Sequence, residues 1–225
     1  LLTTDFSELA RPAALWAGHV AKASGAQLTL LYVHHLGLME HTDAGNSGPH
    51  PDDTAWVEKE FETLRDLIES ETGYKKPEGI MANGYPVEEI ISYAHQHNID
   101  LVVCGSHGAG HANSFFGSNT AALIEAAHPP VLAVPPKATF DGPVKRVLLS
   151  EDLRTVDLSS FLQLMRFASI FQAEVHFLHS SNAEDNLADR LLLRSLIREL
   201  PTVVPAAGGF QAEELPDVKI EQEFI

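Results

Sequence analysis

The residue types that could do chemistry gather in one glycine-rich stretch, GSHGAGHANSFFGSNT, at residues 105–120. It follows an apolar run, IDLVVC, and precedes another, AALIEAA. Glycines between a strand and a helix let backbone N–H groups turn toward an anion, and the helix N-terminus adds a positive dipole end. Because the stretch has no Lys or Arg, it predicts a phosphate held by N–H groups and hydroxyls, with Ser118 capping the helix.

This stretch does not match either of two common phosphate-loop motifs. The pattern GxxxxGK[ST] needs a lysine where His111 stands, and GxGxxG needs a third glycine where Asn113 stands. An empty turn, in which the glycines only allow the chain to reverse, is the alternative interpretation.

Apolar runs and helical patterns alternate along the first part of the chain. Strands are expected at residues 1–4, 26–35, 79–84, 100–104 and 131–135, and helices at 7–24, 53–70, 86–98 and 118–128. This alternation predicts an α/β fold with an open, mostly parallel five-stranded sheet and helices on both faces. Ligands of such sheets bind outside the carboxyl ends of the strands. Residues 3–5, Val33 and the glycine stretch should therefore meet.

Several candidate residues have a structural alternative. Asp5 could cap the first helix, with Glu8 completing a capping box, and this role can coexist with ligand binding. Cys104 ends an apolar strand and is expected to be inert packing. The twelve histidines show no strong zinc spacing, so scattered surface histidines are favoured over a metal site.

Composition excludes several classes of partner. The formal net charge is −16 and the pI is about 5.0, which disfavours nucleic acid and anionic membrane surfaces. One cysteine excludes an internal disulfide and suits a reducing compartment. With no apolar run of membrane-spanning length and no signal-peptide pattern, a cytoplasmic location is expected.

The chain also contains an internal repeat. Leu1 aligns with Leu148 and Ala26 with Ala173 at one constant offset (148 − 1 = 173 − 26 = 147). This predicts a first domain at residues 1–136, a linker at 137–143 and a partial second copy at 144–225 that lacks its own glycine loop. A helix at residues 183–200 and a third strand at 218–225 are expected in the second copy.

The sequence resembles the universal stress protein family. The resemblance is carried by GSHG, a spacer, then GS opening a helix that leads to HPPVLAVP, and by TDFSELA, LLYV and NGYPVEEIISYAHQHNIDLVVCGSHG. It covers nearly all of the first copy, while the second copy resembles the first half of the family's domain. It implies a Rossmann-like fold in a tandem protein whose second domain is incomplete.

The resemblance further implies an adenine-nucleotide site for ATP, with a divalent ion such as Mg²⁺ offsetting the phosphate charge. Its implied residues are Asp5 at the ribose or adenine end, Val33 through its backbone at adenine, Gly105 and Gly108 close to the phosphates, and Gly117, Ser118 and Asn119 on the phosphates. It also implies a homodimer, formed through VLAVP, or an intramolecular pseudo-dimer of the two domains.

The favoured function is a nucleotide-binding regulatory or stress-response module without catalysis, because no nucleophile, base or triad is placed near the loop. Slow, incidental ATP hydrolysis is compatible with it. The alternative is a protein-interaction module that does not bind nucleotide. It is motivated by the eight-residue spacer between Gly108 and Gly117, one residue shorter than is usual in the family. An adenylyl or phosphoryl transferase is a third, weaker hypothesis.

Overall fold

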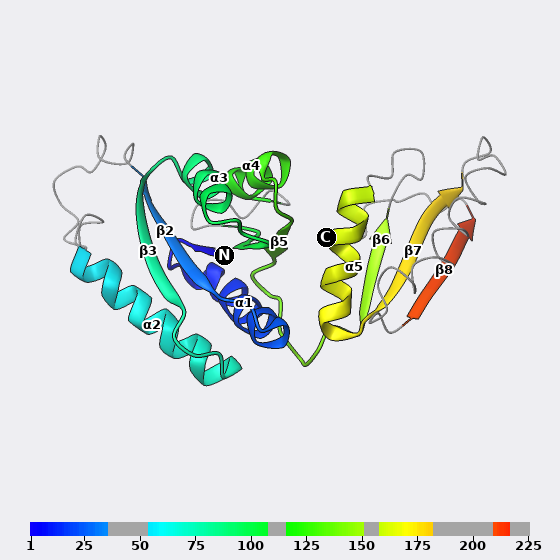
Figure 1. Cartoon of the computed structure of the whole chain (residues 1–225), viewed down its shortest axis with the longest axis horizontal. Coiled ribbons are helices and arrows are strands. Elements are labelled where there is room, and N and C mark those ends of the chain that lie inside the picture. Colours follow the sequence, from blue (N-terminus) through cyan, green and yellow to red (C-terminus); the bar gives the residue numbers. More distant parts are fainter. Residues whose placement is uncertain (36–53, 108–115, 151–157, 182–208, 217–225) are drawn as a thin grey trace. The chain divides into compact units, whose positions relative to one another are not determined.

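The computed structural model describes residues 1–35, 54–107, 116–150, 158–181 and 209–216. It divides into two compact units, Leu1–Phe140 and Asp141–Ile225 (Figure 1). The division falls inside the segment expected to be a linker, residues 137–143.

The first unit is built on a parallel sheet of five strands, as the alternating pattern predicted. The strands are β1 (Leu2–Thr4), β2 (Thr29–His35), β3 (Glu78–Gly84), β4 (Val102–Gly105) and β5 (Val131–Val134). Their order is β3-β2-β1-β4-β5, and every pair is parallel. The chain runs outward from β1 in one direction to β3, and then in the other direction to β5. The carboxyl ends of β1 and β4 therefore flank the switch point where α/β proteins bind ligands.

Helices cover both faces of this sheet (Figure 1). They are α1 (Arg11–Ser24), preceded by a 3₁₀ turn at Glu8–Ala10, α2 (Thr54–Thr72), α3 (Pro86–Gln96) and α4 (Ser118–Ala126). One core layer joins α1 and α2 to the sheet through Leu2, Leu30 and Val103. The other joins α3 and α4 to it through Leu1, Leu31 and Val102. The predicted fold class is confirmed.

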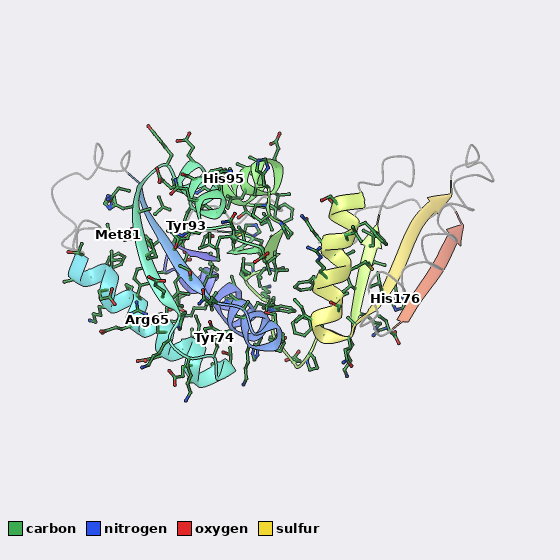
Figure 2. The ribbon with its side chains drawn as sticks, in the orientation of Figure 1. Arg65, Tyr74, Met81, Tyr93, His95 and His176 are labelled. Carbon is green, nitrogen blue, oxygen red and sulfur yellow. The ribbon has the colours of Figure 1, made fainter. Side chains whose placement is uncertain are left out.

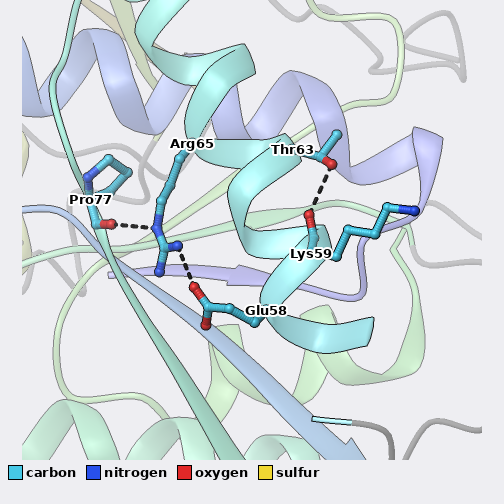
Figure 3. Close-up of polar contacts among 5 residues, drawn as sticks. All are labelled: Glu58, Lys59, Thr63, Arg65 and Pro77. Carbon is cyan, nitrogen blue, oxygen red and sulfur yellow. Dashed lines mark hydrogen bonds and ion pairs between the residues drawn. The ribbon is translucent and has the colours of Figure 1, made fainter. Parts of the chain in front are cut away.

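A hydrogen bond joins helix α2 to the segment that leads into β3 (Figure 3). Arg65 donates from Nε to the carbonyl oxygen of Pro77 at 3.1 Å, and its Nη1 lies 2.6 Å from Glu58 Oε1. Nearby, Tyr74, labelled in Figure 2, uses its hydroxyl to accept from Leu28 N at 2.9 Å and to donate to Ala26 O at 3.2 Å. The two bonds of Tyr74 join the chain just after α2 to the residues that precede β2.

The second unit contains a smaller parallel sheet in the order β6-β7-β8. Its elements are β6 (Arg146–Ser150), α5 (Leu158–Phe171), β7 (Glu174–Ser181) and β8 (Gly209–Pro216). Helix α5 packs on the sheet through Phe161 and Met165, which contact Val175 in one buried cluster.

The β–α–β segment of this unit follows the first at the offset of 147. Adding 147 to the bounds of α1 gives 158–171, which are the bounds of α5. The register repeats as well, since Leu2 pairs with Leu30 and Leu149 pairs with Phe177 (2 + 147 = 149; 30 + 147 = 177). The third strand does not follow the offset. The helix expected at residues 183–200 and the strand expected at 218–225 lie outside the described residues.

Among the helices that the structure describes, none combines the length and apolar composition needed to cross a bilayer.

Candidate functional site

A cavity of about 320 Å³ opens at the carboxyl ends of β1, β2 and β4 and is also lined by the first residues of α3 and α4. This volume lies in the range of small-molecule sites. Its walls are apolar where Ile90 of α3 and Leu123 of α4 line it, and polar beside β1 and the first residues of α4. An apolar wall facing a few polar groups is typical of a site that orients an amphipathic ligand.

The structure brings the sequence-predicted site residues together in this cavity. Its lining includes these residues: Asp5, Val33, Gly105, Gly117, Ser118 and Asn119. Gly108, and most of the spacer that follows it, lie outside the described residues. These residues come from three strand ends and one helix start, so their proximity follows from the parallel sheet and not from closeness in sequence.

The turn after β1 gives Asp5 a different structural role from the expected cap. Its Oδ1 accepts hydrogen bonds from Ser7 N at 3.0 Å and from Ser7 Oγ at 2.6 Å. The 3₁₀ turn begins only after Ser7, and α1 has Ala10 as its N-cap. Glu8 pairs with Arg11 at 2.7 Å. The capping-box alternative therefore does not hold: Asp5 is not an N-cap, and its carboxylate organises the turn that precedes the 3₁₀ turn.

The two described ends of the glycine stretch are joined by hydrogen bonds. Gly117 N donates to Ser106 O at 2.8 Å, and Ser106 N donates to Val134 O at 2.8 Å. Thr120 Oγ1 donates to Gly105 O, also at 2.8 Å. The stretch therefore begins and ends at fixed points beside β4 and β5.

Helix α4 begins one residue earlier than the cap prediction required. Gly117 is the N-cap, with φ −63° and ψ 154°, and no side chain caps the helix. Ser118 is consequently the first helical residue, which corrects its predicted capping role. The first intrahelical bond runs from Ala121 N to Gly117 O at 3.0 Å. The N–H groups of Ser118 and Asn119 precede that bond and have no partner within the helix.

Gly105 lies where the cavity wall leaves little room for a side chain. An added Cβ would stand 3.2 Å from His107 O, 3.6 Å from Leu9 O and 3.7 Å from Ala10 Cα. All three are backbone atoms, which cannot move as a flexible side chain can. Glycine here thus relieves a tight contact with the backbone of His107, whereas the distances to Leu9 and Ala10 are ordinary van der Waals contacts.

Cys104 lies in the cavity wall and is buried, as its place at the end of an apolar strand indicated. Burial raises the pKa of its thiol to about 11, and a hydrogen bond with Thr120 opposes part of that rise. The side chain is therefore a neutral thiol at physiological pH, which fits a packing role.

The histidine prediction is corrected at one position. His34, on β2, is buried, with only 3% of its surface exposed, so it is not a surface histidine. The side chain of His35 and the residues His41 and His50 are not described. Within the described ranges, no group of three or more His, Cys, Asp or Glu side chains is arranged to hold a metal ion.

Sequence reasoning missed several lining residues, among them Tyr32, His107 and Thr120. Tyr32 precedes Val33 on β2 and His107 follows β4, so a wider window around the strand ends would have included both. Thr120 directly follows Asn119, but its position in the sequence does not indicate its hydrogen bond to Gly105.

Comparison with known proteins identifies the family of the first unit. A family model described as the universal stress protein family matches residues 1–135, which is more than half of the chain. No curated protein sequence matches the chain.

Several solved structures are similar to the chain. A universal stress protein from Archaeoglobus fulgidus DSM 4304 has 20% identity and a TM-score of 0.65, covering 96% of this chain and 78% of its own. A putative universal stress protein from Pseudomonas aeruginosa UCBPP-PA14 has 15% identity and a TM-score of 0.52, and the match covers 89% of this chain and 68% of that protein. A universal stress protein in complex with cAMP has 21% identity and a TM-score of 0.47, covering 60% and 94%. At these identities, the first two show a shared fold.

Proposed function

The chain belongs to the universal stress protein family, and on that premise we propose that its first unit binds an adenine nucleotide, ATP, as a regulatory or stress-response module with little or no catalysis. One observation carries the proposal. A single cavity is lined both by Asp5, which follows β1, and by the first residues of α4. It thus offers a hydroxyl-binding end and an anion-binding end.

The start of α4 suits the phosphates. Gly117, Ser118 and Asn119 line the cavity where N–H groups lie ahead of the first intrahelical bond. Such groups, with the helix dipole, favour negative charge without a basic side chain. Ser118 and Asn119 are exposed, so a bound phosphate can reach the hydroxyl of Ser118.

The β1–β2 side suits the nucleoside. A carboxylate accepts hydrogen bonds from ribose hydroxyls, which is the role assigned to Asp5. The backbone of Val33 would meet the adenine edge, and the apolar side chains of Leu31 and Ile90 line the same cavity. A flat, partly apolar base gains from burial against such a wall.

Charge balance favours a metal-bound nucleotide. The cavity lining includes no Lys or Arg among the described residues, and Asp5 adds a negative charge. Mg²⁺ usually keeps several waters and binds substrate phosphates with few protein ligands. We therefore assign the ion chiefly to the phosphates, with the N–H groups of α4 supporting them.

Binding tests this proposal directly. ATP with Mg²⁺ is titrated calorimetrically against the wild type, Gly117→Val and Thr63→Val, the last placing the same side chain on the exposed face of α2. We expect saturable heat for wild type and Thr63→Val, and at least tenfold weaker binding for Gly117→Val, because its side chain would enter the anion end. Negligible heat for all three proteins would refute nucleotide binding. Mass spectrometry of denatured, ligand-free preparations would identify any nucleotide retained from the cell.

An interaction module of the same fold is the second candidate, favoured by the position of β5. Within the described part of the first unit, β5 is an edge strand paired only with β4. An edge strand exposes backbone groups that can pair with another chain. A homodimer in a cytoplasmic setting, or pairing with a second domain, would use this edge. A stable dimer with no response to ATP, detected by sedimentation, would support this candidate over the first.

A further inference from the structure

The turn that carries Asp5 contains an unusual backbone conformation. Phe6, the next residue, has φ +60°. This left-handed region is uncommon for residues other than glycine and is a genuine outlier for a bulky side chain. A residue persists there only when the surrounding contacts over-determine it. The contacts of Phe6 should therefore show what the conformation maintains.

The ring of Phe6 is held by three aromatic side chains. Its centroid lies 4.9 Å from that of Tyr32, 5.8 Å from that of Trp56 and 5.1 Å from that of Phe61, the last two in edge-to-face geometry. Phe61 is 1% exposed, so the ring packs on the buried core between β2 and α2. Aromatic pairs at these distances contribute beyond their buried area. The contacts of the ring thus stabilise a backbone conformation of Phe6 that would otherwise be unfavourable.

The backbone of Phe6 lies within the polar turn that faces the cavity. Phe6 N donates to Thr4 Oγ1 at 2.9 Å, and Ser7 N and Oγ both donate to Asp5 Oδ1. Thr4 and Asp5 line the cavity, whereas Phe6 is partly buried and packs against the core cluster of α1 and α2. Adjacent residues therefore lie in different environments: Asp5 is exposed and lines the cavity, whereas the ring of Phe6 packs against the core.

We propose that Phe6 is a positioning residue for nucleotide recognition: its ring, held by Tyr32, Trp56 and Phe61, fixes the left-handed turn that presents the Asp5 carboxylate to the cavity. This inference rests on the proposed nucleotide binding and deepens it. A carboxylate that must meet a ribose hydroxyl benefits from a fixed position, because ordering the turn on binding would cost affinity. Phe6 acts through Asp5 and does not itself line the site.

A double-mutant cycle on ATP affinity tests the coupling. Phe6→Gly removes the ring and lets the backbone leave the left-handed region, while Asp5→Asn keeps an oxygen that Ser7 can contact but removes the charge. We expect each single variant to bind ATP about tenfold more weakly, and the double variant to be little weaker than Asp5→Asn alone. Phe140→Ala removes a ring that packs on Trp16 and His19, outside the cavity lining, and should bind as wild type does.

The possible outcomes separate the two proposals. Unchanged affinity in Phe6→Gly, or fully multiplicative losses in the double variant, would overturn the role of Phe6 while nucleotide binding stands. No ATP binding by the wild type would overturn the proposed function itself. If thermal melting shows that Phe6→Gly is unfolded, the cycle is run with Phe6→Leu, which keeps an apolar side chain in the cluster. Coupling with Asp5→Asn then supports the proposal, and its absence overturns it.

Discussion

The hydroxyl of Thr120 donates a hydrogen bond to the carbonyl oxygen of Gly105 across 2.8 Å, joining the first turn of α4 to the end of β4. Thr120 is buried, and the bond from Gly117 N to Ser106 O runs beside it. A buried side-chain bond of this kind fixes the helix start relative to the strand end. The position of the α4 start at the cavity consequently depends on Thr120.

Thr120→Val tests this relationship. The substitution keeps the shape of the side chain and removes the donor, leaving the Gly105 carbonyl without it. We expect the free energy of unfolding to fall by about 1 to 3 kcal/mol, the cost of an unsatisfied buried group. ATP affinity should fall too, because the start of α4 is less fixed. Thr120→Ser, which keeps the hydroxyl, is the matched control. Equal denaturation midpoints for Thr120→Val and wild type would contradict the prediction.

Gly105→Ala addresses the tight contact between the end of β4 and the backbone of His107. The new Cβ would meet backbone atoms, the nearest being His107 O at 3.2 Å, so a shift of the cavity wall is required. We expect a loss of about 1 to 3 kcal/mol in stability and a several-fold weaker ATP affinity by calorimetry.

The control for this substitution is Gly25→Ala. Gly25 ends α1 with φ +70°, and a Cβ there would meet nothing within 4 Å. Alanine should destabilise the protein through its backbone conformation but leave ATP affinity unchanged. Equal affinity losses in both variants would mean that general destabilisation, and not the cavity wall, explains the effect.

The fold could be predicted from the sequence because its main signals are local or periodic. Each strand of the first sheet is a short apolar run, and each helix has a repeating apolar face, so the alternation alone indicated a parallel sheet. Most residues of the candidate site could be predicted from the same alternation of strands and helices. Val33 and Gly105 are far apart in sequence, but the carboxyl ends of parallel strands meet at one edge.

The missed features depend on contacts between distant residues. The left-handed conformation of Phe6 is stabilised by Tyr32 and Trp56, and nothing in the local sequence TDFS reports those rings. Ser118 looked like a cap because serine favours that position, yet the bond from Gly117 N to Ser106 O moves the cap to Gly117. His34 looked like a surface histidine because it lies next to a polar loop, although β2 carries it inward.

Gly18→Ala is expected to destabilise the protein, although replacing glycine by alanine inside a helix is usually stabilising. Alanine normally stabilises a helix relative to glycine by about 1 kcal/mol. At Gly18, however, the Cβ would stand 2.8 Å from Thr72 Oγ1 and 2.9 Å from Ile68 Cγ2, which belong to α2. We therefore expect a net loss of about 1 to 3 kcal/mol in denaturant unfolding. A stabilised variant would show that α1 and α2 can separate without cost.

Cys104 should make stability fall at alkaline pH. Burial raises the pKa of its thiol from 9.0 to about 11, so the folded state keeps the proton over a range where the unfolded chain releases it. The resulting stability is fully present below pH 9 and is lost as pH rises from 9 to about 11. The expected loss is on the order of 2 kcal/mol, measured by denaturant unfolding at a series of pH values.

Cys104→Ala separates this effect from other groups that titrate at alkaline pH. Alanine lowers stability at every pH through lost packing, but it removes the thiol titration. The difference in unfolding free energy between wild type and Cys104→Ala should therefore be constant below pH 9 and shrink toward pH 11. A difference that stays constant across this range would show that the folded protein does not disfavour the thiolate. The hydrogen bond from Thr120 lowers the pKa of this thiol, so Thr120→Val should raise that pKa and extend the loss of stability to higher pH.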